Sequence, residues 1–381
     1  MIESEAAARL VWNYENRTMA ALQMNRAGIQ VVGITSNTVP REIVRATGFF
    51  PVLLTGCDGP TPNADLFMEP VFETRLRHIF DRLLAGDWSF LNLLIIPRTS
   101  QHEYKLYLYL CEVSRQGLGF KLPPLYLFDM LHTRSPAIRD YGVTRTRELE
   151  RRLSELSGRA LDRAAIIAAI EESNAVRQAI RKLLDFRRRS HPILSGTDAL
   201  PLIGASYFMD PLEYSELAGT VALAVAQRQP IKGPHVMLKG SVLDHNRLHK
   251  VIESHGAVVV AEDDWWGSRS AGQDVIAGAD PIASLFEKYY LDAPSPRVFP
   301  PEASDEWFRR EVLRDVDGVI FYFSPDDDVL GWDYPRQRAF LQEHGIPNLV
   351  VREEVEEKGS PELNESLEVF IAGLQRQRDK S

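Results

Sequence analysis

The stretch VVGITSNTVPREIVRATGFFPVLLTG, residues 31–56, decides the fold class of this chain. Its apolar, β-branched start belongs to a run over residues 29–35 that is typical of a buried strand. Pro40 follows a few residues later, and proline is favoured in the first turn of a helix because its missing N–H needs no partner there. The stretch therefore predicts a strand followed by a helix, the first step of an α/β alternation.

Elements on either side extend this stretch into an α/β domain over residues 25–132. Residues 1–24 predict a helix in front of the domain. Behind the stretch, apolar residues at helical spacing over 72–83 predict a helix, and the apolar run 90–96 is typical of a central strand that stops at Pro97. The remaining predicted elements are a helix over roughly 102–116 and a strand at 125–128.

The strand pattern disappears over residues 133–232 and returns after Gly233. One face of a long helix in this middle segment carries the apolar residues Ile166, Ile170, Val176, Ile180, Leu183 and Leu184. The strands predicted after Gly233 are 235–239, 257–261, 318–323 and 348–351. We therefore expect two Rossmann-like, doubly wound α/β domains, the second over residues 233–381, with a helical middle segment between them.

The expected sheets limit where a site can lie. Ligands of doubly wound sheets bind beyond the carboxyl ends of the strands, which here are the loops after Ile96, Lys239, Ala261 and Phe323. The sequence has no P-loop, no G-x-G-x-x-G after a strand, no H-E-x-x-H and no G-x-S-x-G. Standard nucleotide-binding and hydrolase sites are therefore not predicted.

The composition excludes several classes of protein. A net charge of -9 argues against a broad surface for nucleic acid. The apolar runs are too short to span a bilayer, and the acidic N-terminus does not have the pattern of a signal peptide, so we expect a cytoplasmic protein that binds neither nucleic acid nor membrane. Cys57 and Cys111 are the only cysteines, too few for a disulfide framework or a four-cysteine metal site.

Three local clusters have both a functional and a structural interpretation. His245 and His249 have the spacing of a metal-chelating pair, but we favour a solvated helix face because Asn246 stands where a zincin needs glutamate. The arginines at 187–189 are suited to a phosphate, but we favour a role in complementing the helix dipole. The aspartates at 326–328 are suited to a cation, but we favour a helix cap.

Two longer stretches carry ordered motifs. A Pro-x-Glu helix start and an A-x-G-x-x-P turn within residues 31–56 are formed by Pro40, Glu42, Ala46, Gly48 and Pro51. A D-D-x-x-G-x-R segment, an Asp-Pro pair, a tyrosine-bearing helix and a proline turn within residues 261–296 are formed by Asp264, Gly267, Arg269, Asp280, Pro281, Tyr290, Pro294 and Pro296. Asn174 and Arg177 add weaker support. In this order the motifs resemble the family of 2-hydroxyacyl-CoA dehydratase and benzoyl-CoA reductase core subunits.

The resemblance implies a four-iron cluster held by three cysteines between two α/β domains, and an ATP-hydrolysing activator that donates an electron to it. The positions that match these cysteines are Glu69, Ser100 and Asp327, and Ser295 replaces the cysteine of the family's Pro-Cys-Pro turn. Iron–sulfur clusters require soft thiolate ligands, whereas carboxylates and hydroxyls favour hard cations. We therefore expect no cofactor in this chain and a 4Fe-4S cluster only in a partner subunit. A divalent cation held by the three replaced positions is an alternative.

The leading hypothesis is a subunit of a CoA-thioester dehydratase or reductase that lacks its own cluster. Its partners would be a cysteine-bearing paralogous core subunit and the activator, and its substrate an acyl-CoA. Arg269, Asp264 and Gly240 are the candidate substrate-binding residues, although Arg269 has the alternative of a structural salt bridge with the aspartates at 263 and 264. The other functions left open are a non-redox acyl-CoA or anion-binding scaffold, and an enzyme with acid–base chemistry in the interdomain cleft.

Overall fold

The computed structural model describes residues 2–56, 58–188, 190–292, 300–327 and 329–380. Within them the strands form two separate four-stranded sheets, and every paired strand is parallel to its neighbour. The prediction of an α/β chain with two separate sheets is confirmed. Cys57, Arg189, Asp328 and the proline turn at 294–296 lie outside the described residues.

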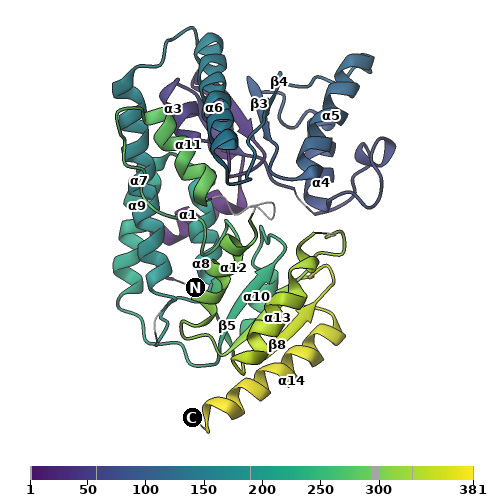
Figure 1. The fold of residues 1–381 in the computed structure, drawn as a ribbon, viewed down its shortest axis with the longest axis vertical. Helices are drawn as coiled ribbons and strands as arrows, with labels where there is room; N and C mark the ends of the chain where they lie inside the picture. The colour runs from purple at the N-terminus through teal and green to yellow at the C-terminus, as the bar shows by residue number, and fades with distance from the viewer. Residues whose placement is uncertain (1, 57, 189, 293–299, 328, 381) are drawn as a thin grey trace.

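The first sheet has the strand order β2-β1-β3-β4. Its strands are β1 (Val31–Ile34), β2 (Phe50–Leu53), β3 (Leu93–Pro97) and β4 (Leu125–Phe128). The helices in this part of the chain are α1 (Glu5–Glu15), α2 (Met19–Arg26), α3 (Arg41–Ala46), α4 (Thr74–Ala85) and α5 (Gln101–Gln116). Figure 1 shows α4 and α5 on one side of the sheet and α3 on the other. The single N-terminal helix that we expected is divided into α1 and α2, because α1 ends at Glu15 with Asn16 as its C-cap and α2 begins only at Met19.

The strand β2 was not predicted, because Pro51 suggested a turn. Pro51 lies inside β2 and is in register with Val32 of β1. β2 is an edge strand in the order β2-β1-β3-β4. Proline is tolerated there because an N–H that faces away from the sheet has no partner strand to lose.

Helices form the middle segment, as the loss of strand pattern predicted. They are α6 (Pro136–Ser157), α7 (Arg163–Asp185), α8 (Gly196–Gly204) and α9 (Pro211–Val225). α7 and α9 lie side by side along one edge of the molecule (Figure 1). The predicted apolar face of the long helix is the buried face of α7, which includes Ile166, Ile170 and Leu183.

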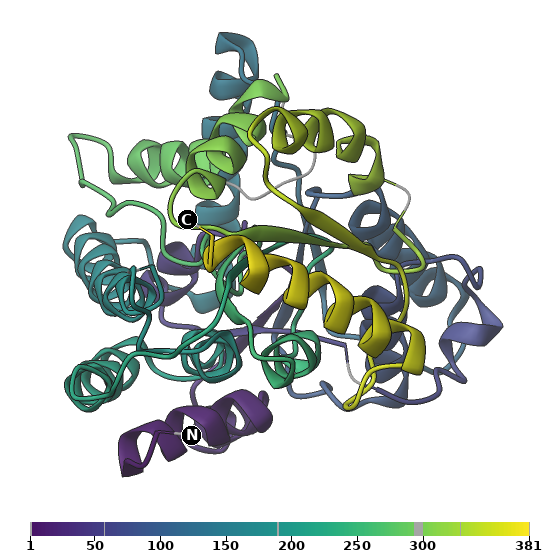
Figure 2. The ribbon, with the colours of Figure 1, turned by 90° about the horizontal axis from the view of Figure 1, so that it is seen from below.

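The second sheet has the order β6-β5-β7-β8. Its strands are β5 (His235–Gly240), β6 (Val258–Glu262), β7 (Gly318–Tyr322) and β8 (Asn348–Val351). The helices that follow β5 are α10 (Arg247–Ser254), α11 (Pro281–Asp292), α12 (Glu302–Val312), α13 (Tyr334–Glu343) and α14 (Pro361–Arg378). Short 3-10 helices are η1 (Ala64–Leu66), η2 (Ala205–Tyr207) and η3 (Leu330–Trp332). α10 and α14 pack on one face of the sheet, and α12 and α13 pack on the other (Figure 2).

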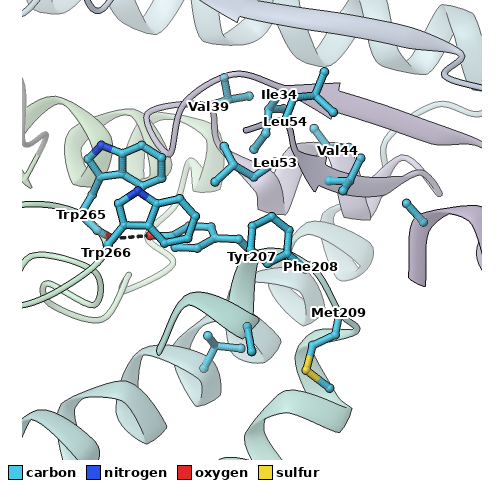
Figure 3. Packing of buried hydrophobic residues seen from close by; sticks show 14 of the residues in the cluster. Ile34, Val39, Val44, Leu53, Leu54, Tyr207, Phe208, Met209, Trp265 and Trp266 are labelled. Atoms are coloured by element: carbon cyan, nitrogen blue, oxygen red, sulfur yellow. Dashed lines mark hydrogen bonds between the residues drawn. The ribbon is translucent and has the colours of Figure 1, made fainter. Parts of the chain in front are cut away.

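An aromatic cluster ties the three parts of the chain together (Figure 3). Trp265 and Trp266, which follow β6, stack on each other with ring centres 4.8 Å apart. Phe208, which follows η2, stacks on Trp266 at 6.0 Å, and the Tyr207 hydroxyl donates to Trp265 O at 2.8 Å. These rings belong to the same buried cluster as the apolar residues of β1 and β2. The segment after β6 thus packs in the core of the first sheet and fixes the position of the second sheet.

Candidate functional site

A cavity of about 1250 Å³ opens between the carboxyl ends of the two sheets. Its lining includes Ser36 and Thr38 after β1, Thr99 and Ser100 after β3, Gly240 at the end of β5 with Ser241 after it, and Ser324 and Asp327 after β7. In both sheets the strand order reverses between the two central strands, and ligand crevices of open parallel sheets form at such a reversal. The prediction that the loops after Ile96 and Phe323 face one cleft is confirmed.

Polar contacts join the two halves across this cavity. Arg17, between α1 and α2, pairs with Asp244, which follows β5, at 2.9 Å. A second contact also joins the two halves: Asp326, which follows β7, accepts a hydrogen bond of 2.5 Å from the backbone N–H of Thr74 at the start of α4. The cavity is therefore held at a defined width by residues from both sheets.

The three positions that match the family's cluster ligands are not brought together. Ser100 lines the cavity and caps α5, because its hydroxyl accepts a hydrogen bond of 3.0 Å from a backbone N–H of the first turn. Asp327 also lines the cavity, and its Oδ1 accepts two backbone N–H bonds of 2.9 and 2.8 Å from the next turn. The capping role expected for the aspartates at 326–328 is thus confirmed for Asp327. Glu69 is exposed outside the cavity lining and accepts a hydrogen bond of 2.8 Å from the Tyr109 hydroxyl.

The chemistry of these donors does not fit an iron–sulfur cluster. Glu69, Ser100 and Asp327 offer oxygen atoms, and the whole sequence has only Cys57 and Cys111. Cys111 lies on α5 as a free, half-buried thiol. Clusters of this type need several thiolates on one site. Across the described ranges, no group of three or more His, Cys, Asp or Glu side chains is arranged to hold a metal ion.

Asp264 is a buried carboxylate that lines the cavity from the loop after β6. Its Oδ1 accepts hydrogen bonds from the backbone N–H groups of Trp266 at 2.9 Å and Gly267 at 2.8 Å. Burial raises the pKa of Asp264 to about 7, and the nearby charge of Glu262 adds to this increase. Asp264 therefore shapes the loop and also places a carboxyl group that titrates near neutral pH beside the cavity.

Gly240 lies at the cavity wall, where the backbone of β5 comes close to the backbone of β7. Its φ is +128°, a conformation that side chains with a Cβ rarely adopt, and an added Cβ would lie 2.0 Å from Tyr322 O. We expect Gly240→Ala to destabilise the fold by more than about 2 kcal/mol in urea unfolding. Gly219→Ala on α9, where a new Cβ would meet nothing within 4 Å, is the matched control and should be neutral or slightly stabilising. Equal stability of the two variants would contradict this expectation.

Arg269 forms the structural salt bridge that was one of its two interpretations. Its guanidinium forms an ion pair with Asp263, which also pairs with Lys239 Nζ at 2.7 Å. The guanidinium lies 4.2 Å from the ring centre of Trp307. Its Nη2 is buried and has no hydrogen-bond partner among the described residues. The structural salt bridge is thus present, and one N–H group of a residue that lines the cavity is still unused.

Glu103 is a candidate functional residue that the sequence did not reveal. It lies in the first turn of α5 and lines the cavity, and it is 2% exposed. Burial raises its pKa to about 7, a change that Arg75 opposes and Glu73 reinforces. The Thr35 hydroxyl, at the end of β1, lies 3.5 Å from Glu103 Oε1. The sequence signal was available as the Ser-x-x-Glu capping pattern that starts at Ser100.

The structure contradicts the solvated face expected for His249 and the helix-dipole role expected for Arg187. His249 is fully buried, not on a solvated face, and its Nε2 lies 2.9 Å from Glu262 Oε1. Arg187 is also fully buried and pairs with Glu262 through both Nη atoms, so it does not serve the helix dipole. His245, the other member of the histidine pair, lines the cavity. Partners for these side chains come from segments far away in sequence, which local spacing does not indicate.

Several motif residues form a buried scaffold away from the cavity. Glu42 on α3 pairs with Arg177 on α7 and accepts a hydrogen bond of 2.8 Å from the Tyr289 hydroxyl on α11. Arg177 donates to Asn174 at 2.8 Å, and Asn174 in turn holds the backbone of Val275. The Arg177 guanidinium helps to hold the pKa of Glu42 below its usual range despite burial. These residues fix the packing of three helices that surround the first sheet.

The sequence comparisons agree with this arrangement of motifs. The sequence model of the family described as 2-hydroxyglutaryl-CoA dehydratase, D-component, matches residues 37–372. The chain belongs to this family. The resemblance inferred from the motifs is therefore confirmed, and the match covers the second sheet, the helical middle segment and every strand of the first sheet except β1.

Similar proteins in this dehydratase family include subunits of two kinds of enzyme. The beta subunit of (R)-phenyllactyl-CoA dehydratase from Clostridium sporogenes is 20% identical over 361 residues, which are 92% of this chain and 93% of that protein. The beta subunit of (R)-2-hydroxyglutaryl-CoA dehydratase from Acidaminococcus fermentans is 22% identical, over 94% and 96% of the two chains. A benzoyl-CoA reductase subunit from Thauera aromatica is 26% identical, over 65% and 64%. In the parts of the chain that the structure describes, no helix is long and apolar enough to cross a membrane.

Proposed function

We propose that this chain is a subunit of a CoA-thioester dehydratase or reductase that has no iron–sulfur cluster of its own and acts with a cluster-bearing partner. Family membership supports the CoA-thioester class. The absence of thiolates at the positions of Glu69, Ser100 and Asp327 supports the assignment of the cluster to a partner. That partner is a cysteine-bearing paralogous core subunit, which receives electrons from an ATP-hydrolysing activator. We also interpret each sheet as a Rossmann-like, doubly wound sheet.

The cavity between the sheets is the proposed site for the acyl-CoA. The observation that carries this proposal is that Arg269, whose buried Nη2 has no hydrogen-bond partner among the described residues, lines a cavity of about 1250 Å³. A guanidinium N–H in such a place donates a strong hydrogen bond to a thioester carbonyl or a phosphate oxygen. Asp264 holds the loop that carries Arg269, and Gly240 lets the backbone of β5 approach β7. The three predicted substrate-binding residues thus have distinct proposed roles.

Binding of (R)-phenyllactyl-CoA, the thioester named for one relative, tests this proposal. We expect the chain, alone or with its cysteine-bearing partner, to bind the thioester in calorimetry, and Arg269→Gln to weaken affinity about tenfold or more. Arg115→Gln, which removes a side chain that is 72% exposed on α5, is the control and should leave affinity unchanged. Equal affinities of Arg269→Gln and wild type would contradict the role of Arg269. Failure of both the chain and the complex to bind would contradict the site.

A second candidate function rests on two carboxyl groups. Glu103 and Asp264 line the cavity from opposite sheets, and burial raises the pKa of each to about 7. Carboxyl groups that titrate near neutral pH are suited to general acid–base catalysis. Conversion of an acyl-CoA by the isolated chain, without reductant or ATP, would favour this function over the electron-transfer subunit.

A further inference from the structure

A second, much smaller pocket lies away from the cavity, where the end of α7 meets the second sheet. Its volume is about 20 Å³, and it is lined by the charged or polar residues Arg187, Arg188, His235, Glu311, Arg314 and Asp315. A site needs roughly 10–15 Å³ to hold one water molecule, so this pocket has room for one particle of about that size. A phosphate or sulfate ion is too large for it.

Two arginines of this pocket have N–H groups without partners. The Nε of Arg187 and the Nε and Nη2 of Arg188 are buried, and none of these three atoms makes a hydrogen bond with a described residue. Arg187 is fully buried, and its two Nη groups donate hydrogen bonds to the Glu262 carboxylate and the Val259 carbonyl oxygen. Arg188 Nη2 lies 2.9 Å from Glu311 Oε2, but the geometry does not make a hydrogen bond. Buried guanidinium N–H groups that lack an acceptor are costly, so an acceptor is expected in the pocket.

The charge around the pocket favours an anion over water as that acceptor. Three guanidinium groups line it against the two carboxylates of Glu311 and Asp315, and Glu311 is shared by Arg188, Arg310 and Arg314. Burial lowers the pKa of Arg188, and the positive charges of Arg187 and Arg314 lower it further, although Glu311 opposes the change. A hydrogen bond from a charged donor to an anion is about twice as strong as one between neutral groups.

We propose that this pocket binds one chloride ion, or another monatomic anion of similar size. The ion accepts hydrogen bonds from the N–H groups of Arg187 and Arg188 that have no hydrogen-bond acceptor among the described residues. It thereby links the end of α7 to the second sheet beside α12. Arg314, whose side chain is 64% exposed, lies at the solvent side of the pocket. The site is separate from the proposed acyl-CoA site and does not depend on it. Because the ion binds only the folded chain, it stabilises that chain by mass action.

Bromide in crystals of the full chain provides the first test. We expect an anomalous peak in the pocket within hydrogen-bond distance of Arg188, and a bromide-free pocket that holds water would overturn the proposal. In solution, replacing gluconate with chloride at constant ionic strength should raise Tm by about 2 °C or more. Equal Tm values in the two salts would also overturn it.

Matched variants locate the effect. Arg188→Met keeps an unbranched side chain but removes the donors, so the difference in Tm between chloride and gluconate should disappear. Arg181→Gln removes an arginine of α7 that pairs with Asp274 outside the pocket, and the difference should persist. A chloride effect retained in Arg188→Met would place the ion elsewhere. If Arg188→Met does not fold, the bromide experiment on the unmodified chain still decides.

Discussion

Expressed alone and purified without oxygen, the chain is expected to be colourless, with negligible iron and acid-labile sulfide and no electron-paramagnetic signal after reduction. A cluster of the family type needs several thiolates that converge on one site. The sequence has two cysteines, and neither matches a ligand position. Ser100 and Asp327 already cap backbone N–H groups, and Glu69 lies outside the cavity. Oxygen donors of this kind do not replace thiolates on iron–sulfur clusters.

The measurement needs a protein that does hold a cluster under the same conditions. A core subunit of this family that has the three cysteines, purified in parallel, serves as the control and should retain iron and sulfide. Near-stoichiometric iron with sulfide in the unmodified, isolated chain would contradict the expectation. It would also return the chain to the conventional cluster-bearing class of dehydratase subunits.

Local pattern predicted most of the fold because parallel sheets place continuous apolar strands between helices. The strands at 125–128 and 348–351 have the predicted bounds. β2 was missed because Pro51 suggests a turn until its edge position is known. α14 was also missed, although Leu363, Leu367 and Ile371 have helical spacing and its N-cap Ser360 is a standard start signal.

The candidate site was predictable only in part. Ser100 and Asp327 follow central strands and Gly240 ends one, and parallel strands bring these ends to one edge, so their common cavity could be expected. The pairing of Arg187 with Glu262 could not, because it joins residues 75 positions apart and depends on how the helical segment packs on the second sheet. The burial of Glu103 has the same origin, since a capping glutamate is usually exposed to solvent.

Glu262→Gln is expected to destabilise the fold by about 3–5 kcal/mol, which is the cost of leaving a buried charge without its partner. Glu262 is 1% exposed, Arg187 is fully buried, and the amide would leave Arg187 without its carboxylate partner. Arg187 and the hydrogen bond from His249 lower the pKa of Glu262 to about 2 although burial opposes them. A carboxylate whose pKa falls on folding stabilises the folded chain above its ordinary pKa of 4.5 and loses this contribution as pH falls towards 2.

The difference in unfolding free energy between wild type and Glu262→Gln should therefore be complete at neutral pH and shrink as pH falls from 4.5 towards 2, in urea titrations at several pH values. Glu155→Gln is the matched control, because it breaks an exposed Arg151–Glu155 pair of 2.8 Å on α6 and should cost less than about 0.5 kcal/mol. Replacing Arg187 and Glu262 together with methionine should cost less than Glu262→Gln alone, since no buried charge is then left unpaired. A loss of less than about 1 kcal/mol in Glu262→Gln would mean that water reaches Arg187 and that the pair is not buried in solution.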